Sequence, residues 1–158
     1  MPRFGKTVPA PLRDGLAAAG VEHILHLGDF TAPEVAGWFA RLAPFDAVAG
    51  NNDPPELWKR FGRKKVVTFA GVRIGLIHGD GPGKTTLERA VNAFAADTVD
   101  AILFGHSHNP YCKRHGTTWV LNPGSPTDKR RNPRYSYGIL KVSNQNLTPS
   151  LHYFDLSC

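Results

Sequence analysis

The chain has 158 residues, of which 41% are hydrophobic and 20% charged. This length supports one domain with a hydrophobic core and excludes two. No apolar run approaches the roughly 20 residues that span a bilayer, and the N-terminus lacks the apolar segment of a secretion signal. Cys112 and Cys158 are not spaced as a metal or redox pair. We therefore expect a cytoplasmic protein with no membrane association.

The charge balance favours anionic partners. Nineteen Lys and Arg against thirteen Asp and Glu give a formal net charge of +6. Phosphate esters, nucleotides and nucleic acid are all compatible with this charge, although no motif indicates nucleic acid. One basic cluster, Lys129-Arg130-Arg131-Asn132-Pro133-Arg134, has two interpretations. It is either a solvated loop or a rim that attracts phosphate.

The first two thirds of the chain alternate helices and strands. The predicted elements are a helix at 9–20, a strand at 24–27, a helix at 33–42, a strand at 47–49, a hairpin at 65–69 and 72–77, a helix at 84–96 and a strand at 101–104. The first helix places Leu12, Leu16 and Ala19 on one face and ends at Gly20. The helix at 84–96 is the longest of those predicted.

The last third contains strands alone, which are predicted at 111–114, 117–121, 135–142 and 147–154. Alternation of strands and helices favours βαβ crossovers and a largely parallel first sheet. The final run of strands favours a second, mostly antiparallel sheet. The predicted fold is therefore α/β, an αββα sandwich of two mixed sheets flanked by helices.

Four predicted strands are followed by a glycine next to a potential metal ligand. These segments are Gly28-Asp29, Gly50-Asn51-Asn52-Asp53, His78-Gly79 and Gly105-His106-Ser107-His108. In an open α/β sheet, ligands bind at the carboxyl ends of the strands. Each motif alone is weak, because a lone Gly-Asp is usually a turn and a lone histidine is usually structural. Their repetition at four strand ends favours a shared site.

The residue types at these strand ends suit a transition metal. A carboxylate, an amide oxygen and imidazoles form a mixed oxygen and nitrogen set, which favours Mn, Fe, Zn or Co over Ca and Mg. No thiolate belongs to the set, so a structural zinc site is not expected. Two such metals about 3.5–4 Å apart can hold a phosphoryl group and activate water for in-line attack.

In this order, the four segments resemble the calcineurin-like metallophosphoesterase superfamily, and most closely its small bacterial and archaeal YfcE-like phosphodiesterase branch. The segment Leu121-Asn122-Pro123-Gly124-Ser125 resembles the loop that follows the site in that branch. The resemblance extends from Met1 to about Asp155. It implies an αββα sandwich with a dinuclear centre, often containing manganese, and hydrolysis of small phosphate esters by a metal-activated water.

The resemblance also implies a role for each matching residue. Asp29 would bridge the two metals, Asn51, His78 and His106 would complete the second site, and His108 would belong to the first. Manganese is the expected metal, with nickel, cobalt, zinc or iron as alternatives. His106 and Asn52 would act in catalysis. Many members have a histidine that assists the leaving group at the position of Asn52, and an asparagine there can donate a hydrogen bond but cannot act as a general acid.

The chain departs from the family pattern at its start. The family opens with an apolar strand that ends in Asp-x-His, which supplies two ligands of the first metal, and no Asp-x-His occurs in these 158 residues. We therefore expect a single phosphoesterase domain over 1–158 that is truncated at its N-terminus. Loss of a central strand predicts poor stability, about one bound metal per chain and impaired hydrolysis.

Two further interpretations concern other classes of function. Gly79-Asp80-Gly81-Pro82-Gly83-Lys84-Thr85 resembles a phosphate-binding P-loop, but its spacing is one residue short. A helix start is the preferred interpretation, with Thr85 or Gly83 near the cap and Lys84 available to bind an anionic substrate. The second alternative is a non-catalytic scaffold, similar to the metallophosphoesterase-like subunit of the retromer coat. The sequence does not identify the substrate or the oligomeric state.

Overall fold

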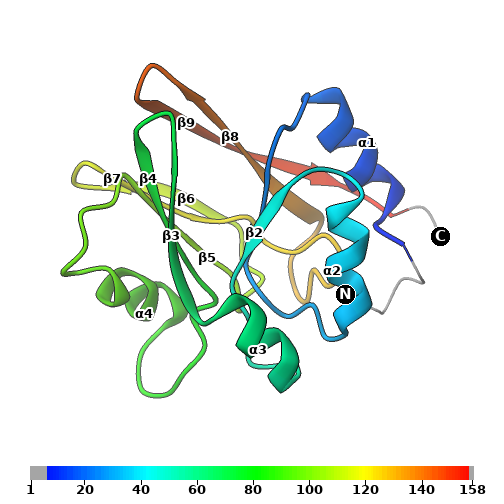
Figure 1. Ribbon diagram of the computed structural model, residues 1–158, viewed down its shortest axis with the longest axis horizontal. Helices are drawn as coiled ribbons and strands as arrows, with labels where there is room; N and C mark the ends of the chain where they lie inside the picture. Colours follow the sequence, from blue (N-terminus) through cyan, green and yellow to red (C-terminus); the bar gives the residue numbers. More distant parts are fainter. Residues whose placement is uncertain (1–6, 157–158) are drawn as a thin grey trace.

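The computed structural model describes residues 7–156, and Figure 1 shows its elements. In chain order, they are α1 (Ala10–Ala18), β1 (Ile24–His26), α2 (Pro33–Ala40), β2 (Phe45–Ala47), α3 (Pro55–Phe61), β3 (Lys64–Phe69), β4 (Val72–Ile77), α4 (Thr86–Ala93), β5 (Ala101–Phe104), β6 (Tyr111–His115), β7 (Thr118–Asn122), β8 (Tyr135–Ser143) and β9 (Asn146–Phe154). Within residues 7–156, none of the helices combines the length and apolar character needed to cross a membrane.

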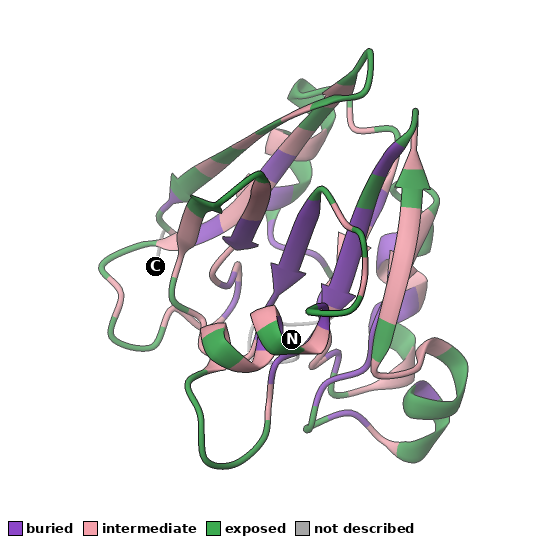
Figure 2. Ribbon diagram, turned by 90° about the vertical axis from the view of Figure 1, so that its left-hand side faces the viewer, coloured by how far each residue is buried: buried purple, intermediate pink, exposed green. Residues whose placement is uncertain are grey.

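The strands form three hydrogen-bonded groups. The largest is a mixed sheet in the order β3-β4-β5-β7-β6, in which β4, β5 and β7 are parallel and both edge strands are antiparallel to their neighbours. Strands β1 and β2 form a parallel pair, and β8 and β9 form an antiparallel hairpin. Figure 2 shows that the buried residues concentrate in the strands at the centre of the molecule.

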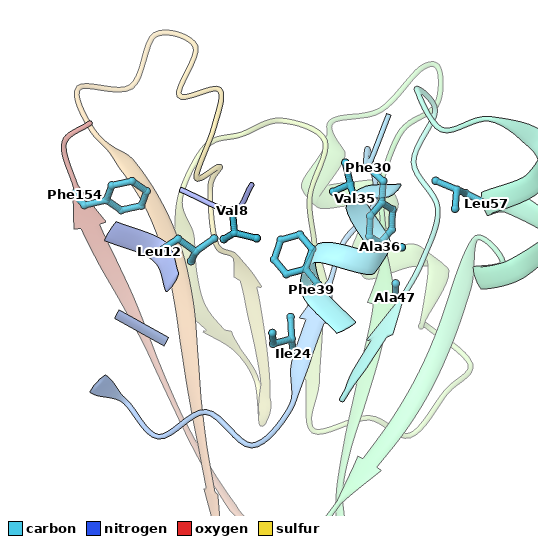
Figure 3. Packing of buried hydrophobic residues seen from close by; sticks show 10 residues of the cluster. All are labelled: Val8, Leu12, Ile24, Phe30, Val35, Ala36, Phe39, Ala47, Leu57 and Phe154. Atoms are coloured by element: carbon cyan, nitrogen blue, oxygen red, sulfur yellow. The ribbon is translucent and has the colours of Figure 1, made fainter. Parts of the chain in front are cut away.

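Three hydrophobic clusters give the layers of the sandwich. One joins α1, α2 and α3 to β1, β2 and the end of β9 (Figure 3). The second lies between the five-stranded sheet and the other two groups of strands, and the third joins α4 to the outer face of that sheet. In β5, Ala101 and Leu103 face the second cluster while Ile102 and Phe104 face the third. Because both faces of β5 are covered, the strand is apolar throughout.

The order of the layers is therefore helix, strand, strand, helix, and the predicted αββα class is confirmed. The strands are distributed differently from the prediction. β6 and β7 join the same sheet as β4 and β5, while β8 and β9 remain a separate hairpin. The reason is that β7 pairs in parallel with β5 and so extends the first run of strands instead of starting a second sheet.

A groove of about 890 Å³ lies between β1 and β8. Among the described strands, β1 pairs with β2 alone and β8 with β9 alone, so each keeps one edge without a strand partner. The groove walls are largely apolar and include Leu25, Leu103, Leu121, Ile139 and Leu140. The polar residues at one end of the groove belong to the predicted site.

The structure differs from the prediction at three elements. Helix α3 was not predicted, because Pro54-Pro55 resembles a loop, whereas a proline is well suited to the first position of a helix. Strand β2 lies two residues earlier than expected. Helix α4 is two turns long and is shorter than α1, because it begins after Thr85. Thr85 and Glu88 form a capping box, so the segment that resembles a P-loop is a helix start, as preferred.

Candidate metal centre

Four strand ends meet at one edge of the molecule. Asp29 follows β1, His78 follows β4 and His106 follows β5, each one to three residues after the strand, while Asn51 follows β2 at a greater distance. Parallel pairing places the carboxyl ends of β1 and β2 together and those of β4 and β5 together. The contact between Asn51 and His78 joins the two pairs. The polar end of the groove is lined by Asp29, His78, His106 and His108, with Asn52 at its side.

The side chains of Asp29, Asn51 and His78 converge on one point. Nε2 of His78 lies 3.2 Å from Oδ1 of Asn51 and 3.4 Å from Oδ2 of Asp29. Oδ1 of Asn51 also lies 3.0 Å from Nδ1 of His106. When the His78 ring is neutral, three lone pairs face one another, because the other ring nitrogen carries the proton. A cation satisfies such an arrangement.

Backbone carbonyls fix the orientation of two histidines. Nδ1 of His78 lies 2.5 Å from the carbonyl oxygen of Leu27, and Nδ1 of His108 lies 2.6 Å from that of Asp128. A carbonyl accepts hydrogen bonds and cannot donate, so each Nδ1 carries the proton and donates it. The Nε2 lone pair of each ring is thereby left for a metal, an arrangement common to metal-binding histidines.

The electrostatic environment keeps the carboxylate of Asp29 charged. Burial alone would raise the pKa of Asp29, but its contact with His78 and the hydrogen bonds donated by Asn52 outweigh this effect and hold the pKa well below its usual range. The side chain of Asn52 donates to Oδ2 at 2.8 Å, and its backbone N–H donates to Oδ1 at 3.0 Å. Asp29 is therefore ionised at neutral pH, as a metal ligand must be.

His106 and His108 favour their neutral form. Burial lowers the pKa of His106, and the nearby His78 lowers it further. Burial also lowers the pKa of His108, although its hydrogen bond to the Asp128 carbonyl opposes the shift. Both rings are then unprotonated at neutral pH and available to a cation.

Three of the candidate ligands have a left-handed backbone. The φ angles are +58° at Asp29, +57° at His106 and +59° at His108. Residues other than glycine are uncommon in this region, which costs about 1–3 kcal/mol for each residue, and such residues cluster at functional sites. Each residue turns the chain directly after a strand, so the strain places the side chain at the strand end.

Two glycines allow the loops to approach closely. A Cβ atom at Gly28 would lie 2.6 Å from the backbone nitrogen of Gly50, and one at Gly50 would lie 2.2 Å from Oδ1 of Asp29. Any side chain at either position would therefore separate the Asp29 loop from the Asn51 loop.

Sequence reasoning missed the residue that joins these loops. Asp53 is buried, and its carboxylate accepts the backbone N–H groups of Asp29 at 2.9 Å, Thr31 at 2.8 Å and Gly50 at 2.8 Å. Asp53 belongs to the Gly-Asn-Asn-Asp segment that the sequence singled out. The neighbouring residues in the sequence did not indicate which groups its carboxylate would bind. Asp53 therefore holds the Asp29 and Asn51 loops together.

Further polar residues support the loops from behind. Nε1 of Trp58 donates to the carbonyl of Gly50 at 2.8 Å, and Arg63 donates to the carbonyl of Ala49 at 3.2 Å and forms an ion pair with Asp80. The buried side chain of Asn122 donates to the carbonyl of Gly105 at 2.8 Å, just before His106. In the sequence, Asn122 is notable only as part of the segment that resembles the family's loop after the site.

Comparison with known proteins identifies the family. The model of the calcineurin-like phosphoesterase superfamily domain matches residues 7–145. The chain belongs to this superfamily. A probable metallophosphoesterase of Methanothermobacter thermautotrophicus is 29% identical over 151 residues, which are 93% of this chain and 83% of that protein. The resemblance inferred from the four strand ends is thus confirmed, and with it divalent metal chemistry at the level of the family.

Solved structures of the same fold include two informative neighbours. Wild-type Vps29 complexed with Zn²⁺, from Entamoeba histolytica, has a TM-score of 0.76 and 23% identity, over 98% of this chain and 93% of that one. A novel archaeal phosphodiesterase has a TM-score of 0.70 and 20% identity, over 90% of both chains. At these identities the likeness shows the phosphoesterase fold and no specific activity.

The predicted site residues of this superfamily member occupy different positions relative to the site. Asp29, Asn51, His78 and His106 lie together, and His108 lies at the groove end on the other side of the turn after β5. Lys84 is exposed and lines a separate hollow with Arg89, Ser107 and Tyr111. Lys84 therefore lies near the turn that bears the histidines but outside the groove.

The ligand set fits a divalent cation but is not closed around one. No group of three or more His, Cys, Asp and Glu side chains in residues 7–156 lies close enough to hold a metal ion without other ligands. The convergence depends on the amide oxygen of Asn51, which bridges His78 and His106. An amide oxygen in the ligand set is compatible with Mn and other divalent ions of this family.

Proposed function

We propose that this protein is a metal-dependent phosphodiesterase that hydrolyses small phosphate esters at a dinuclear site. The observation that carries the proposal is the convergence of a carboxylate oxygen, an amide oxygen and an imidazole lone pair from Asp29, Asn51 and His78. Membership of the calcineurin-like phosphoesterase superfamily supports hydrolysis as the reaction class.

The proposed ligands divide into two sets. Asp29, Asn51, His78 and His106 would hold one metal, while Asp29 and His108 would contribute to the other. Manganese is the proposed ion, with Ni, Co, Zn or Fe as alternatives. When bound, the metals would supply charge to the phosphoryl oxygens and activate a water for attack.

The remaining chemistry belongs to protein side chains. Asn52 has both its amide and its backbone N–H on the carboxylate of Asp29, so it orients the bridging ligand. The same amide can donate a hydrogen bond to the leaving group but cannot protonate it. We therefore expect activated esters with good leaving groups to be the better substrates. His106 would stabilise charge on the phosphoryl group in addition to binding metal.

The proposed setting is the cytoplasm, with a small phosphate ester as substrate and no nucleic acid required. Lys84 would help to hold the anionic substrate from the neighbouring hollow, where it lies with Arg89. The net charge of +6 supports attraction of phosphate esters to the whole molecule.

The test is hydrolysis of bis(p-nitrophenyl) phosphate with added Mn²⁺, compared with a blank that contains the metal alone. The chain should show weak turnover that Asp29→Asn and His106→Ala abolish. An exposed substitution far from the site, Asp155→Asn, should leave the rate unchanged. Absence of turnover with Mn²⁺, Ni²⁺, Co²⁺ and Zn²⁺ in folded protein would contradict the proposal.

A protein-binding scaffold is the second candidate. The similarity in fold to Vps29 favours it, as does the small number of ligands for the first metal. The two candidates differ in what Asp29 does. A scaffold should keep its fold and any partner binding after Asp29→Asn, whereas the proposed enzyme loses metal and turnover together.

A further inference from the structure

One basic side chain faces the candidate metal centre from the loop that follows β7. Arg130 lines the groove that Asp29, His106 and His108 also line, whereas its neighbours Lys129 and Arg131 do not line it. The basic cluster predicted from the sequence is therefore not uniform. One of its members is directed to the site.

The other cations of the cluster are held or directed elsewhere. Nζ of Lys129 donates to the carbonyl of Pro133 at 2.7 Å, and Arg134 pairs with Asp155 at 3.1 Å. Arg131 is exposed. Within residues 7–156, no hydrogen bond or ion pair is made by the guanidinium of Arg130, which lines the groove together with His106 and His108. An unpaired guanidinium beside a metal centre is positioned to bind an anion.

The loop is fixed to a candidate ligand rather than free. The carbonyl of Asp128 accepts from Nδ1 of His108, and Nδ2 of Asn132 donates to the carbonyl of His108 at 3.0 Å. Asp128 and Asn132 flank Arg130 in sequence, so the loop is attached to His108 on both sides of Arg130. Nδ2 of Asn132 also donates to the carbonyl of Lys129 at 3.0 Å, which closes the turn. The backbone of Arg130 is therefore held in a constant position relative to His108.

The backbone of Arg130 is itself strained. Its φ is +48°, and its N–H donates to Oδ1 of Asp128 at 3.2 Å. An arginine in the left-handed region is unfavourable, and such residues are found where the surrounding structure imposes them, often at ligand sites.

We propose that Arg130 binds the non-bridging oxygens of the phosphoryl group held at the candidate metal centre. Guanidinium groups donate two parallel hydrogen bonds to phosphate, which adds geometric selectivity to charge. Arg130 then sets both affinity and orientation of the anion, while the metal ligands remain on the strand ends. This proposal rests on the proposed function, because it assigns a further residue to the same site.

The test measures binding of phenylphosphonate, a phosphate-ester analogue that cannot be hydrolysed, to Mn²⁺-loaded protein by isothermal titration calorimetry. Arg130→Gly removes the guanidinium and suits the positive φ, so the loop should be retained. We expect about 10- to 100-fold weaker binding for Arg130→Gly, and an intermediate loss for Arg130→Lys, which keeps charge but loses the paired donors.

Arg131→Ala is the matched control, because it removes the same charge from the adjacent residue outside the groove. Its affinity for phenylphosphonate should stay within about twofold of the unaltered protein. Equal losses in Arg130→Gly and Arg131→Ala would overturn the proposal, since binding would then depend on net charge alone. If the unaltered protein binds Mn²⁺ and phenylphosphonate and Arg130→Gly binds as well, Arg130 has no such role while the proposed function stands. If the unaltered protein binds neither, both proposals fail.

Discussion

Oδ2 of Asp53 accepts the backbone N–H of Asp29 at 2.9 Å, so one carboxylate holds the residue proposed to bridge two metals. The same oxygen accepts from Gly50, and the other oxygen accepts from Thr31. Asp53 is buried and contributes no side-chain atom to the groove end. The position of Asp29 thus depends on a residue that has no direct part in the proposed chemistry.

Asp53→Asn should therefore reduce both stability and metal affinity. The amide offers one acceptor atom instead of two, which leaves at least one buried N–H unpaired, and we expect a loss of roughly 1–3 kcal/mol in the free energy of unfolding. Urea unfolding followed by circular dichroism gives this quantity. The exposed Asp14→Asn should change it by less than about 0.5 kcal/mol. Equal effects of the two substitutions would show that Asp53 is dispensable.

Metal stoichiometry separates the two proposed metal sites. One site has four protein ligands and the other has Asp29 and His108, and two ligands hold a labile divalent ion poorly. We expect about one tightly bound Mn²⁺ per chain by isothermal titration calorimetry and elemental analysis. His78→Ala should abolish this binding, whereas His108→Ala should leave it nearly unchanged. Two tightly bound ions would mean that other residues complete the second set.

The lowered pKa of His26 should make the free energy of unfolding depend on pH. This ring stacks on Phe30 with 3.7 Å between centroids and contacts the edge of Phe39, and burial is the main cause that lowers its pKa to about 3. Between that value and the ordinary value, the unfolded chain binds a proton that the folded chain does not. Stability must then fall as the pH is lowered through this range.

His26→Phe removes the titrating group and keeps an aromatic ring. Relative to this variant, the unaltered protein should lose up to about 1.4 kcal/mol of stability per pH unit below pH 6.5. Denaturant unfolding at pH 7, 6, 5 and 4 measures the difference between the two proteins. Parallel pH profiles would mean that His26 takes up a proton in the folded state without cost.

The groove between β1 and β8 predicts a response to an added strand. Both flanking strands have an edge without a strand partner in the described chain, and exposed edges favour aggregation. An N-terminal extension of about ten residues with a five-residue apolar run should fill the groove, raise Tm and increase the monomeric fraction. A glycine and serine extension of equal length is the control. Thermal melts and size-exclusion runs that do not distinguish the two extensions would exclude this use of the groove.

Much of the fold follows from local pattern. The apolar run Ala101-Ile102-Leu103-Phe104 predicted β5 without error because a strand buried on both faces has no polar position. Ala70-Gly71 located the turn between β3 and β4, and both residues have positive φ. Helix α3 was missed because two prolines conceal a helix start, and its apolar residue Leu57 is buried by contacts distant in sequence.

The site was predictable to the level of its strand ends. A glycine lies next to Asp29, His78 and His106. This pattern can be recognised in the sequence, because tight turns and close approach of two backbone segments require glycine. The roles of Asp53, Asn122 and Arg130 have no such pattern, because each depends on partners 17 or more residues away or on the course of a loop. Likewise, the partition of strands among sheets depends on the β5–β7 pairing, which no segment encodes alone.

Because Asp29, His106 and His108 have a left-handed backbone, substitutions that increase stability at these three positions should decrease activity. Glycine at any of them would relax the chain and remove a proposed ligand in the same step, and asparagine would do so in part. A selection for heat resistance alone would therefore accumulate inactive variants at these positions. Directed evolution of this protein would need a screen for turnover in every round.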